Sequence, residues 1–196
     1  MSELDLLKFI HPKLTLSEKK DHLFKNILDV LAWYDLLFLE IPIDGWLTYL
    51  MGLFTDLDEL ELEEACRNLV VADRHRAKIF QGRHQLKNAF FLLNQKSDLS
   101  ASQVYRICHD IPVESLLLLI AQTEEPKIRK NISQYLTKYR GINPTLRGED
   151  LKSLGYLPGP LFRKILDHLR DGWLDGKIRS REEEIDFLQE HFPIAN

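Results

Sequence analysis

The residues best suited to chemistry in this sequence are glycines and cations around a predicted hairpin, Gly155-Tyr156-Leu157-Pro158-Gly159. A glycine-bounded turn that opens onto a helix N-terminus exposes backbone N–H groups without intrahelical partners, and such donors bind phosphate oxygens. The two glycines carry no Cβ, so a sugar-phosphate backbone could approach closely. Lys152 precedes the hairpin, and Arg163 and Lys164 follow it by one helical turn. The pattern is that of a helix-hairpin-helix, which grips a nucleic-acid backbone independently of base sequence.

The charge of the surrounding segment favours phosphate binding over the alternative, in which the glycines and Pro158 only make a tight turn. Residues 126–181 carry thirteen Lys or Arg against five Asp or Glu, a net charge of +8, although the whole chain has a net charge of -4. Such segregation indicates a polyanionic partner, with solvated basic helix faces as the alternative interpretation. The residues predicted to contact the polyanion are Lys127, Arg129, Lys130, Arg140, Arg147, Lys152, Gly155, Gly159, Arg163 and Lys164.

Two short motifs have the residue types of metal sites but lack the partners that such sites need. Asp56-Leu57-Asp58 has the spacing of a carboxylate pair, but no predicted strand or Gly-Ser pair precedes it, so we interpret it as a solvated turn. His109-Asp110 is the dipeptide of metal-dependent phosphohydrolases, which also need an upstream histidine and a downstream aspartate. No downstream partner stands out. We predict no catalytic residue and no metal site on this chain, and keep such a hydrolase as a third hypothesis.

Other basic and aromatic residues have interpretations that the sequence leaves open. The cations and histidines between residues 67 and 87 give the middle helical segment a basic side, which is interpreted as a solvated face or as an extension of the basic track. Five aromatic residues fall at core-facing spacings and are expected to pack: Trp33, Trp46, Phe54, Phe90 and Phe91. Three others near the basic segment remain possible base-stacking residues: Tyr139, Tyr156 and Trp173.

Apolar residues recur at three- and four-residue intervals, and no alternating stretch bounded by turn residues predicts a strand. The sequence therefore predicts an all-α fold. Capping spacing predicts helix starts at Thr15, Ser100 and Ser180, and Gly141 is expected to end a helix in the left-handed conformation. One long helix should follow Thr15 and end at Pro42. Further helices are expected over residues 46–54, 60–70, 73–93, 100–107, 112–123, 126–140, 160–173 and 180–191.

Turn residues after position 141 predict two domains, a multi-helix body over residues 1–141 and a small helical tail over residues 142–196. The tail would contain the helix-hairpin-helix-like element. The longest apolar run, residues 116–121, is far shorter than the roughly 20 residues of a membrane span, and no secretory signal is recognised. Cys66 and Cys108 are expected to be small buried side chains in a reducing compartment. We expect a folded cytoplasmic protein without a membrane partner.

The order of short motifs around the hairpin resembles a known family. The motifs are G-x-D-L, L-G, P-G-P, I-L and D-G-x-I, at residues 148–151, 154–155, 158–160, 165–166 and 175–178. Over about residues 146–188 this order resembles the C-terminal tail of class II tRNA nucleotidyltransferases, which include CCA-adding enzymes, A-adding enzymes and bacterial poly(A) polymerases. The earlier helical segment, with His11-Pro12, Trp33-Tyr34 and Trp46, resembles the body region of longer members through weaker motifs.

The resemblance implies that this chain holds tRNA, or another structured RNA, by backbone contacts while a catalytic head adds nucleotides to the 3′ end. In the family the head carries a Gly-Ser and a D-x-D pair and uses Mg²⁺ and nucleotide triphosphates. No Gly-Ser pair is present here, so no cofactor is expected on this chain. CCA addition, A addition and polyadenylation all remain open. The alternative is a helical protein-interaction domain, without RNA binding, whose acidic first helices dock on a partner.

Overall fold

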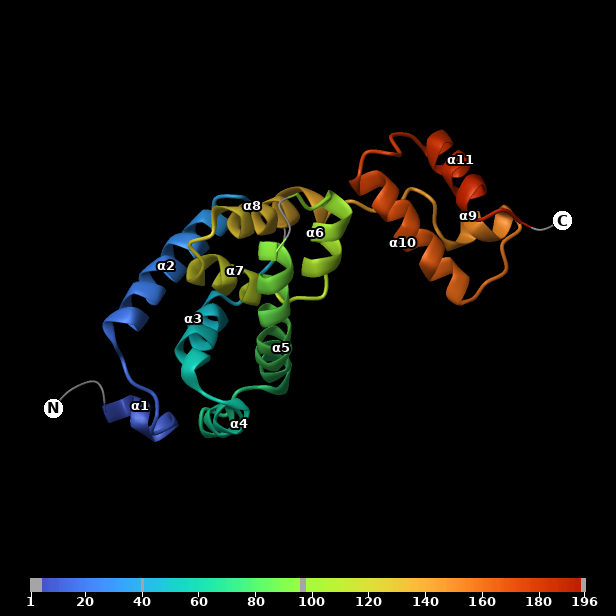
Figure 1. Cartoon of the computed structure of the whole chain (residues 1–196). Coiled ribbons are helices and arrows are strands. Elements are labelled where there is room, and N and C mark those ends of the chain that lie inside the picture. The colour runs from blue at the N-terminus through green and yellow to red at the C-terminus, as the bar shows by residue number, and fades with distance from the viewer. Residues whose placement is uncertain (1–4, 40, 96–97, 195–196) are drawn as a thin grey trace. The chain divides into compact units, whose positions relative to one another are not determined.

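The computed structural model describes residues 5–39, 41–95 and 98–194, and every regular element in these ranges is a helix (Figure 1). The described ranges contain no strand, so the predicted all-α fold is confirmed. Contacts divide the chain into two compact units. Unit 1 comprises residues 1–96 and 110–132, and unit 2 comprises residues 97–109 and 133–196. The predicted domain division at residue 142 stays a prediction, but the short segment 97–109 groups with the second unit.

Unit 1 is built around α7 (Val113–Gln122), in which Val113 through Ala121 are all buried. Seven of its ten residues are apolar, and α2, α3 and α5 all pack against it. Gly82 permits a close approach of α5 to α7, since a Cβ there would lie 2.0 Å from the Ser115 Oγ. The other helices of unit 1 are α1 (Asp5–Ile10), α2 (Glu18–Asp35), α3 (Gly45–Leu53), a 3₁₀ turn (Phe54–Asp56), α4 (Glu59–Asn68), α5 (Asp73–Gln95) and α8 (Pro126–Gln134).

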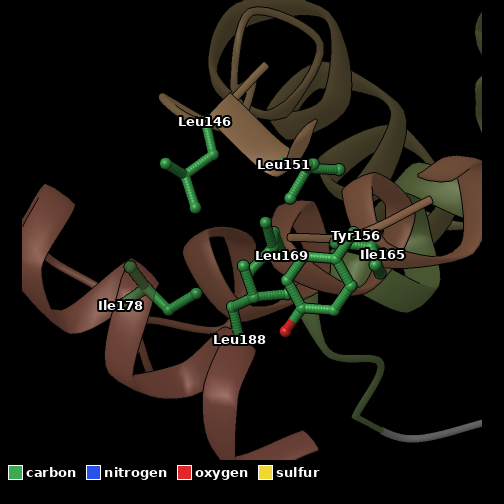
Figure 2. Close-up of a cluster of buried hydrophobic side chains, with 7 residues drawn as sticks. All are labelled: Leu146, Leu151, Tyr156, Ile165, Leu169, Ile178 and Leu188. Atoms are coloured by element: carbon green, nitrogen blue, oxygen red, sulfur yellow. The ribbon is translucent and has the colours of Figure 1, made fainter. Parts of the chain in front are cut away.

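Unit 2 packs short helices from both of its chain segments. They are α6 (Ala101–Cys108), a π-helix (Tyr135–Tyr139), α9 (Gly148–Ser153), α10 (Pro160–Leu174) and α11 (Arg181–His191). Figure 2 shows the apolar core that joins the last three of these helices to their loops. Its buried members are Leu146, Leu151, Tyr156, Ile165, Leu169, Ile178 and Leu188.

A buried carboxylate fixes the segment that leads into α9. Glu184 of α11 is fully buried and accepts hydrogen bonds from the backbone N–H groups of Thr145, at 3.1 Å, and Leu146. The Thr145 hydroxyl also donates to this carboxylate. Charge-assisted hydrogen bonds of this kind offset the cost of burying a carboxylate. The start of α9, and therefore the hairpin that follows it, is tied to α11.

The structure confirms two of the predicted helix starts and corrects other details. Ser100 and Ser180 each accept a hydrogen bond from the backbone three residues on. The first cap, however, is Ser17 rather than Thr15, because its side chain accepts from the N–H of Lys20. Gly141 is not left-handed, since the preceding π-helix closes through the N–H of Arg140, which donates to Tyr135. The short helix α1 was not predicted.

Candidate nucleic-acid interface

Gly155 is required by the way in which α9 ends. Its N–H donates to the carbonyl of Lys152 at 2.9 Å, and the N–H of Tyr156 donates to Leu151 at 3.0 Å. This pair of bonds is the Schellman motif, which needs a left-handed residue just after the helix, and Gly155 has φ +94°. The glycine therefore turns the chain sharply into the predicted hairpin.

Gly159 has a different role from the one that its residue type suggested. Its φ of 162° is extended backbone that any residue can adopt, and a Cβ there would meet no atom within 4 Å. The open space beside Gly159 is the feature that matters, because it leaves the start of α10 accessible. Pro160 occupies the first helical position, where its missing N–H costs no hydrogen bond.

The hairpin presents several backbone donors without partners. Within the described part of the chain, no carbonyl or side chain accepts a hydrogen bond from the N–H of Leu157, Gly159 or Leu161. All three lie between the end of α9 and the first turn of α10, where the helix dipole is positive. Free donors at such a position bind phosphate oxygens readily.

The hairpin backbone is anchored from behind. Tyr156 is only 7% exposed, belongs to the apolar core of unit 2 in Figure 2, and donates its hydroxyl to the carbonyl of Phe192 at 2.7 Å. Tyr156 therefore packs in the core and is not available for base stacking. Because its neighbours in the hairpin are held by this anchor, the free donors have a fixed position before any ligand binds.

Three predicted cations, Lys152, Arg163 and Lys164, surround the hairpin and are all exposed; we call them the hairpin cations. Lys152 pairs with Glu149 at 2.8 Å, and Arg163, whose side chain is 90% exposed, lies 4.0 Å from Asp167. These are surface pairs between adjacent turns, which contribute little stability and can be replaced by a phosphate. Lys164 makes no ion pair with the described residues.

Arg140 and Arg147 lie in the segment between the π-helix and α9. Arg140 directly follows the π-helix, and its Nη1 is buried without a hydrogen-bond partner in the described part of the chain. The guanidinium is half-buried, so its charge is only partly available to solvent. Arg147 is exposed at the N-cap of α9, and its backbone N–H donates to Asp150 at 2.7 Å.

The remaining three predicted residues lie on α8 and belong to unit 1. Lys127 is half-buried, whereas Arg129 and Lys130 are exposed. Arg129 donates from Nε to the carbonyl of Thr123 at 2.8 Å, which places its guanidinium at the start of α8. The structure thus brings six of the ten predicted residues together near α9, the hairpin and α10, and places Arg140 before them and the α8 residues in the other unit.

Five exposed cations of unit 2 were not among the predicted residues; Arg106 and Arg181 make ion pairs, whereas Lys138, Lys177 and Arg179 make none with the described residues. Lys177 lies in the D-G-x-I motif, directly after the left-handed Gly176, and Arg179 follows the motif. The signal that could have identified the last three cations was the net positive charge of residues 126–181, which contains all three.

The basic side of α5 is largely used inside unit 1. Arg76 lies 3.3 Å from Glu63, and Lys78 lies 2.7 Å from the buried Glu114. Arg83 donates to the carbonyls of Phe54 and Leu57. These contacts hold α5 to its neighbours, so the structure favours a structural role for these cations over an extended RNA track.

The two aspartates of the Asp56-Leu57-Asp58 motif have structural roles. Asp58 is the N-cap of α4, with a complete capping box, and the Asp56 carboxylate lies 3.0 Å from Lys20. In the described ranges no group of three or more His, Cys, Asp or Glu residues could hold a metal ion. The buried thiols were predicted correctly: burial raises the pKa of Cys66 to about 11 and that of Cys108 to about 12.

The aromatic residues follow the predictions only in part. Phe54 is buried, as expected from its spacing. Trp46, Phe90 and Phe91 are 50%, 39% and 54% exposed, so the prediction that they pack in the core was wrong. Trp46 instead makes an edge-on contact with the ring of His75, with ring centroids 4.9 Å apart, at the side of an apolar groove.

The chain is similar to curated tRNA nucleotidyltransferases. It is 31% identical over 189 residues to the A-adding tRNA nucleotidyltransferase of Geobacter sulfurreducens, which covers 94% of this chain and 22% of the relative. It is 27% identical over 100 residues to the A-adding enzyme of Halalkalibacterium halodurans, covering 51% of this chain and 23% of the relative. No family model matches. The chain thus spans about a fifth of the length of the curated relatives that it matches.

Solved structures have the same fold. The Thermotoga maritima CCA-adding enzyme complexed with tRNA-CCA superposes with a TM-score of 0.75 and 19% identity, over 95% of this chain and 45% of that one. An apo form of a CCA-adding enzyme gives a TM-score of 0.74 over 96% of this chain and 43% of that one. The predicted resemblance to the tRNA nucleotidyltransferases is therefore confirmed. In the described residues no helix is long and apolar enough to cross a membrane.

Proposed function

We propose that this chain is the RNA-holding part of a tRNA nucleotidyltransferase, and that it binds tRNA mainly through the phosphate backbone. The observation that carries this proposal is the hairpin, where three unpartnered N–H groups and the three hairpin cations meet on an anchored backbone. Because shape and phosphates offer little base information, recognition would depend on the fold of the RNA rather than on its sequence. The similarity to A-adding and CCA-adding enzymes supports tRNA as the ligand.

The chemistry of nucleotide addition is assigned to a catalytic head that this chain does not contain. The described residues offer no acidic cluster that would fit Mg²⁺. Two-metal catalysis of phosphoryl transfer needs such carboxylates a few ångströms apart. The head would supply the metal and nucleotide sites, and the present chain would hold the RNA in place. The α8 cations Lys127, Arg129 and Lys130 are included in the proposed contact set.

The direct test removes two hairpin cations. We expect the double variant Arg163→Ala/Lys164→Ala to bind a tRNA transcript more weakly, because two phosphate contacts are lost. The slope of log K against log salt should flatten by about 1 for each lost contact. Filter binding at four or five salt concentrations measures both quantities.

A charge-matched control distinguishes local contact from general attraction. Lys19 and Lys25 are exposed on α2, in the acidic part of the chain. The double variant Lys19→Ala/Lys25→Ala removes the same charge and should leave the salt slope unchanged. If the hairpin variant keeps wild-type affinity and slope, or if both variants lose affinity equally, the proposed role of the hairpin is wrong.

A second candidate function is supported by an apolar groove in unit 1. The groove has a volume of about 800 Å³ and is lined by residues of α1, α2, α3, the end of α4 and the start of α5. Trp46 and Val70 are 50% and 86% exposed at this groove. Exposed apolar surface of this extent is typical of a protein-interaction site. A pull-down whose partner recovery survives RNase treatment would favour this alternative.

A further inference from the structure

The hairpin carries an apolar residue that phosphate binding does not explain. Leu157 is 83% exposed, although the residue before it is almost fully buried. It is not part of the apolar core of unit 2 in Figure 2, and Pro158 beside it is also exposed. A single exposed leucine is ordinary on a protein surface. This one, however, lies within the row of free N–H donors.

The apolar surface continues on both sides of Leu157. Leu161, in the first turn of α10, is 43% exposed, and Ile194 is 47% exposed. Ile194 lies at the base of the hairpin, since its Cδ1 would be 3.4 Å from a Cβ at Gly155. The hairpin thus combines an apolar tip with donors and cations, whereas a loop that only connects two helices would expose polar residues.

The backbone of the tip is held in position without the help of the Leu157 side chain. Tyr156 is fixed by its two hydrogen bonds, to Leu151 and to Phe192, and Gly159 begins α10. Leu157 is therefore a rigidly placed apolar side chain, and little conformational entropy of the backbone would be lost when it makes a contact.

The chemistry of a nucleic-acid backbone fits this arrangement. Along each strand anionic phosphates alternate with sugars, whose carbon-rich faces are apolar, and the shallow minor groove of A-form RNA exposes the sugars. A phosphate held by the hairpin N–H groups would place the adjoining sugar beside the tip. A protein partner fits less well, because an ordinary protein interface needs about 800 Å² from each side and the tip offers only a few side chains.

We propose that Leu157 is a positioning residue for RNA, which packs on the sugar of the nucleotide whose phosphate the hairpin holds. This inference rests on the proposed RNA-holding function and adds an uncharged contact to it. The apolar contact excludes water from the neighbouring phosphate site and fixes how far the hairpin enters the groove. Its contribution to affinity is independent of salt, because no counterion is released when an uncharged group binds.

The test uses Leu157→Ser in the full chain with a tRNA transcript as the probe. We expect binding about tenfold weaker, as for partial loss of a buried leucine side chain. The slope of log K against log salt should stay at its wild-type value. Leu157→Met, which keeps an apolar side chain of similar size, should restore the affinity. Leu60, on α4, is 84% exposed, and Leu60→Ser is the matched control that should bind like wild type.

The outcomes separate this inference from the function on which it rests. If Leu157→Ser binds with wild-type affinity while the Arg163→Ala/Lys164→Ala variant is impaired, the proposed role of Leu157 is wrong and the proposed function stands. A changed salt slope for Leu157→Ser would also overturn it, since the substitution would then act through the phosphate contacts. If the charge variant binds normally, the proposed function itself fails.

Discussion

Ser102 and Asp175 are joined by two hydrogen bonds across 73 residues of sequence. The backbone N–H of Ser102 donates to Oδ1 of Asp175 at 2.9 Å, and its hydroxyl donates to Oδ2 at 2.7 Å. Ser102 lies in the first turn of α6, and Asp175 is the C-cap of α10. A carboxylate at a helix N-terminus satisfies free donors and interacts favourably with the helix dipole. One turn further on, Arg106 of α6 pairs with Asp171 of α10.

We expect Asp175→Ala to loosen α6, because the substitution removes both acceptors. The loss should be about 1 kcal/mol of local stability. Amide hydrogen exchange in α6 measures it, and a double-mutant cycle with Ser102→Ala should show strong coupling. Asp186→Ala, which removes an exposed carboxylate of α11, is the control and should not change exchange in α6. Equal exchange rates in the two variants would contradict the prediction.

Val70 occupies a backbone conformation that suits glycine. It follows the end of α4 with φ +52°, and its N–H donates to Arg67 at 3.0 Å in a Schellman motif. A β-branched residue is strained in this left-handed region. Val70→Gly should therefore stabilise unit 1, by up to about 1 kcal/mol after the added flexibility of the unfolded chain is subtracted.

Urea unfolding checks the sign of the Val70 effect. The neighbouring Val71 does not have a positive φ, so Val71→Gly only removes a side chain and should destabilise the protein. A loss of stability in both variants would mean that the strain at Val70 is negligible.

We expect His168 to make the stability of unit 2 dependent on pH. Its ring stacks on Phe187 with centroids 5.3 Å apart, and its Nε2 is buried without a partner in the described chain. Burial, followed by the nearby His191, lowers the pKa of His168 below its ordinary value of 6.5. Because the unfolded chain binds this proton more readily, the stabilisation is complete above about pH 6.5 and is lost as the pH falls.

His168→Phe should remove this part of the pH dependence. The phenyl ring keeps the stacking on Phe187 and leaves no buried polar atom unsatisfied, so the variant should gain about 1 kcal/mol at neutral pH. The gain should be larger at pH 5.5, because protonation of His168 in the unfolded chain lowers the stability of the wild type there. Thermal unfolding between pH 5 and 8 measures both effects. His22→Gln, at an exposed histidine of α2 that makes no ion pair with the described residues, should follow the wild-type curve. Parallel curves for wild type and His168→Phe would refute the assignment.

Local sequence signals predicted the helices well, whereas contacts between residues far apart in the sequence could not be predicted from it. The caps at Ser100 and Ser180 depend on residues within one turn, so their spacing reveals them. The grouping of α6 with unit 2 involves long-range contacts such as Ser102 with Asp175, and nothing local connects those two residues. Similarly, periodicity identified an apolar face containing Trp46, but whether another element covers that face is decided by tertiary packing.

In the candidate site, too, local features were predictable from sequence and long-range contacts were not. The turn at Gly155 was predicted because a glycine is a local requirement of this helix end. The cations of α5 could not be sorted from sequence, because the carboxylates that pair with them, such as Glu63 and Glu114, come from other helices. Leu157 was passed over because a leucine is expected to be buried, and only the structure reveals that it is exposed.

The discontinuous make-up of unit 2 has a consequence for synthesis on the ribosome. Helix α6 emerges long before its partners, since Asp171 and Asp175 are translated 65 and 73 residues after the α6 residues that they bind. During that interval Val104 and Tyr105, both buried in the finished unit, lack the partners from α10. A nascent chain stalled after residue 141 would therefore display α6 with its π-helix neighbour but without α10. A separately expressed tail beginning at residue 142 would lack two helices of unit 2, α6 and the π-helix.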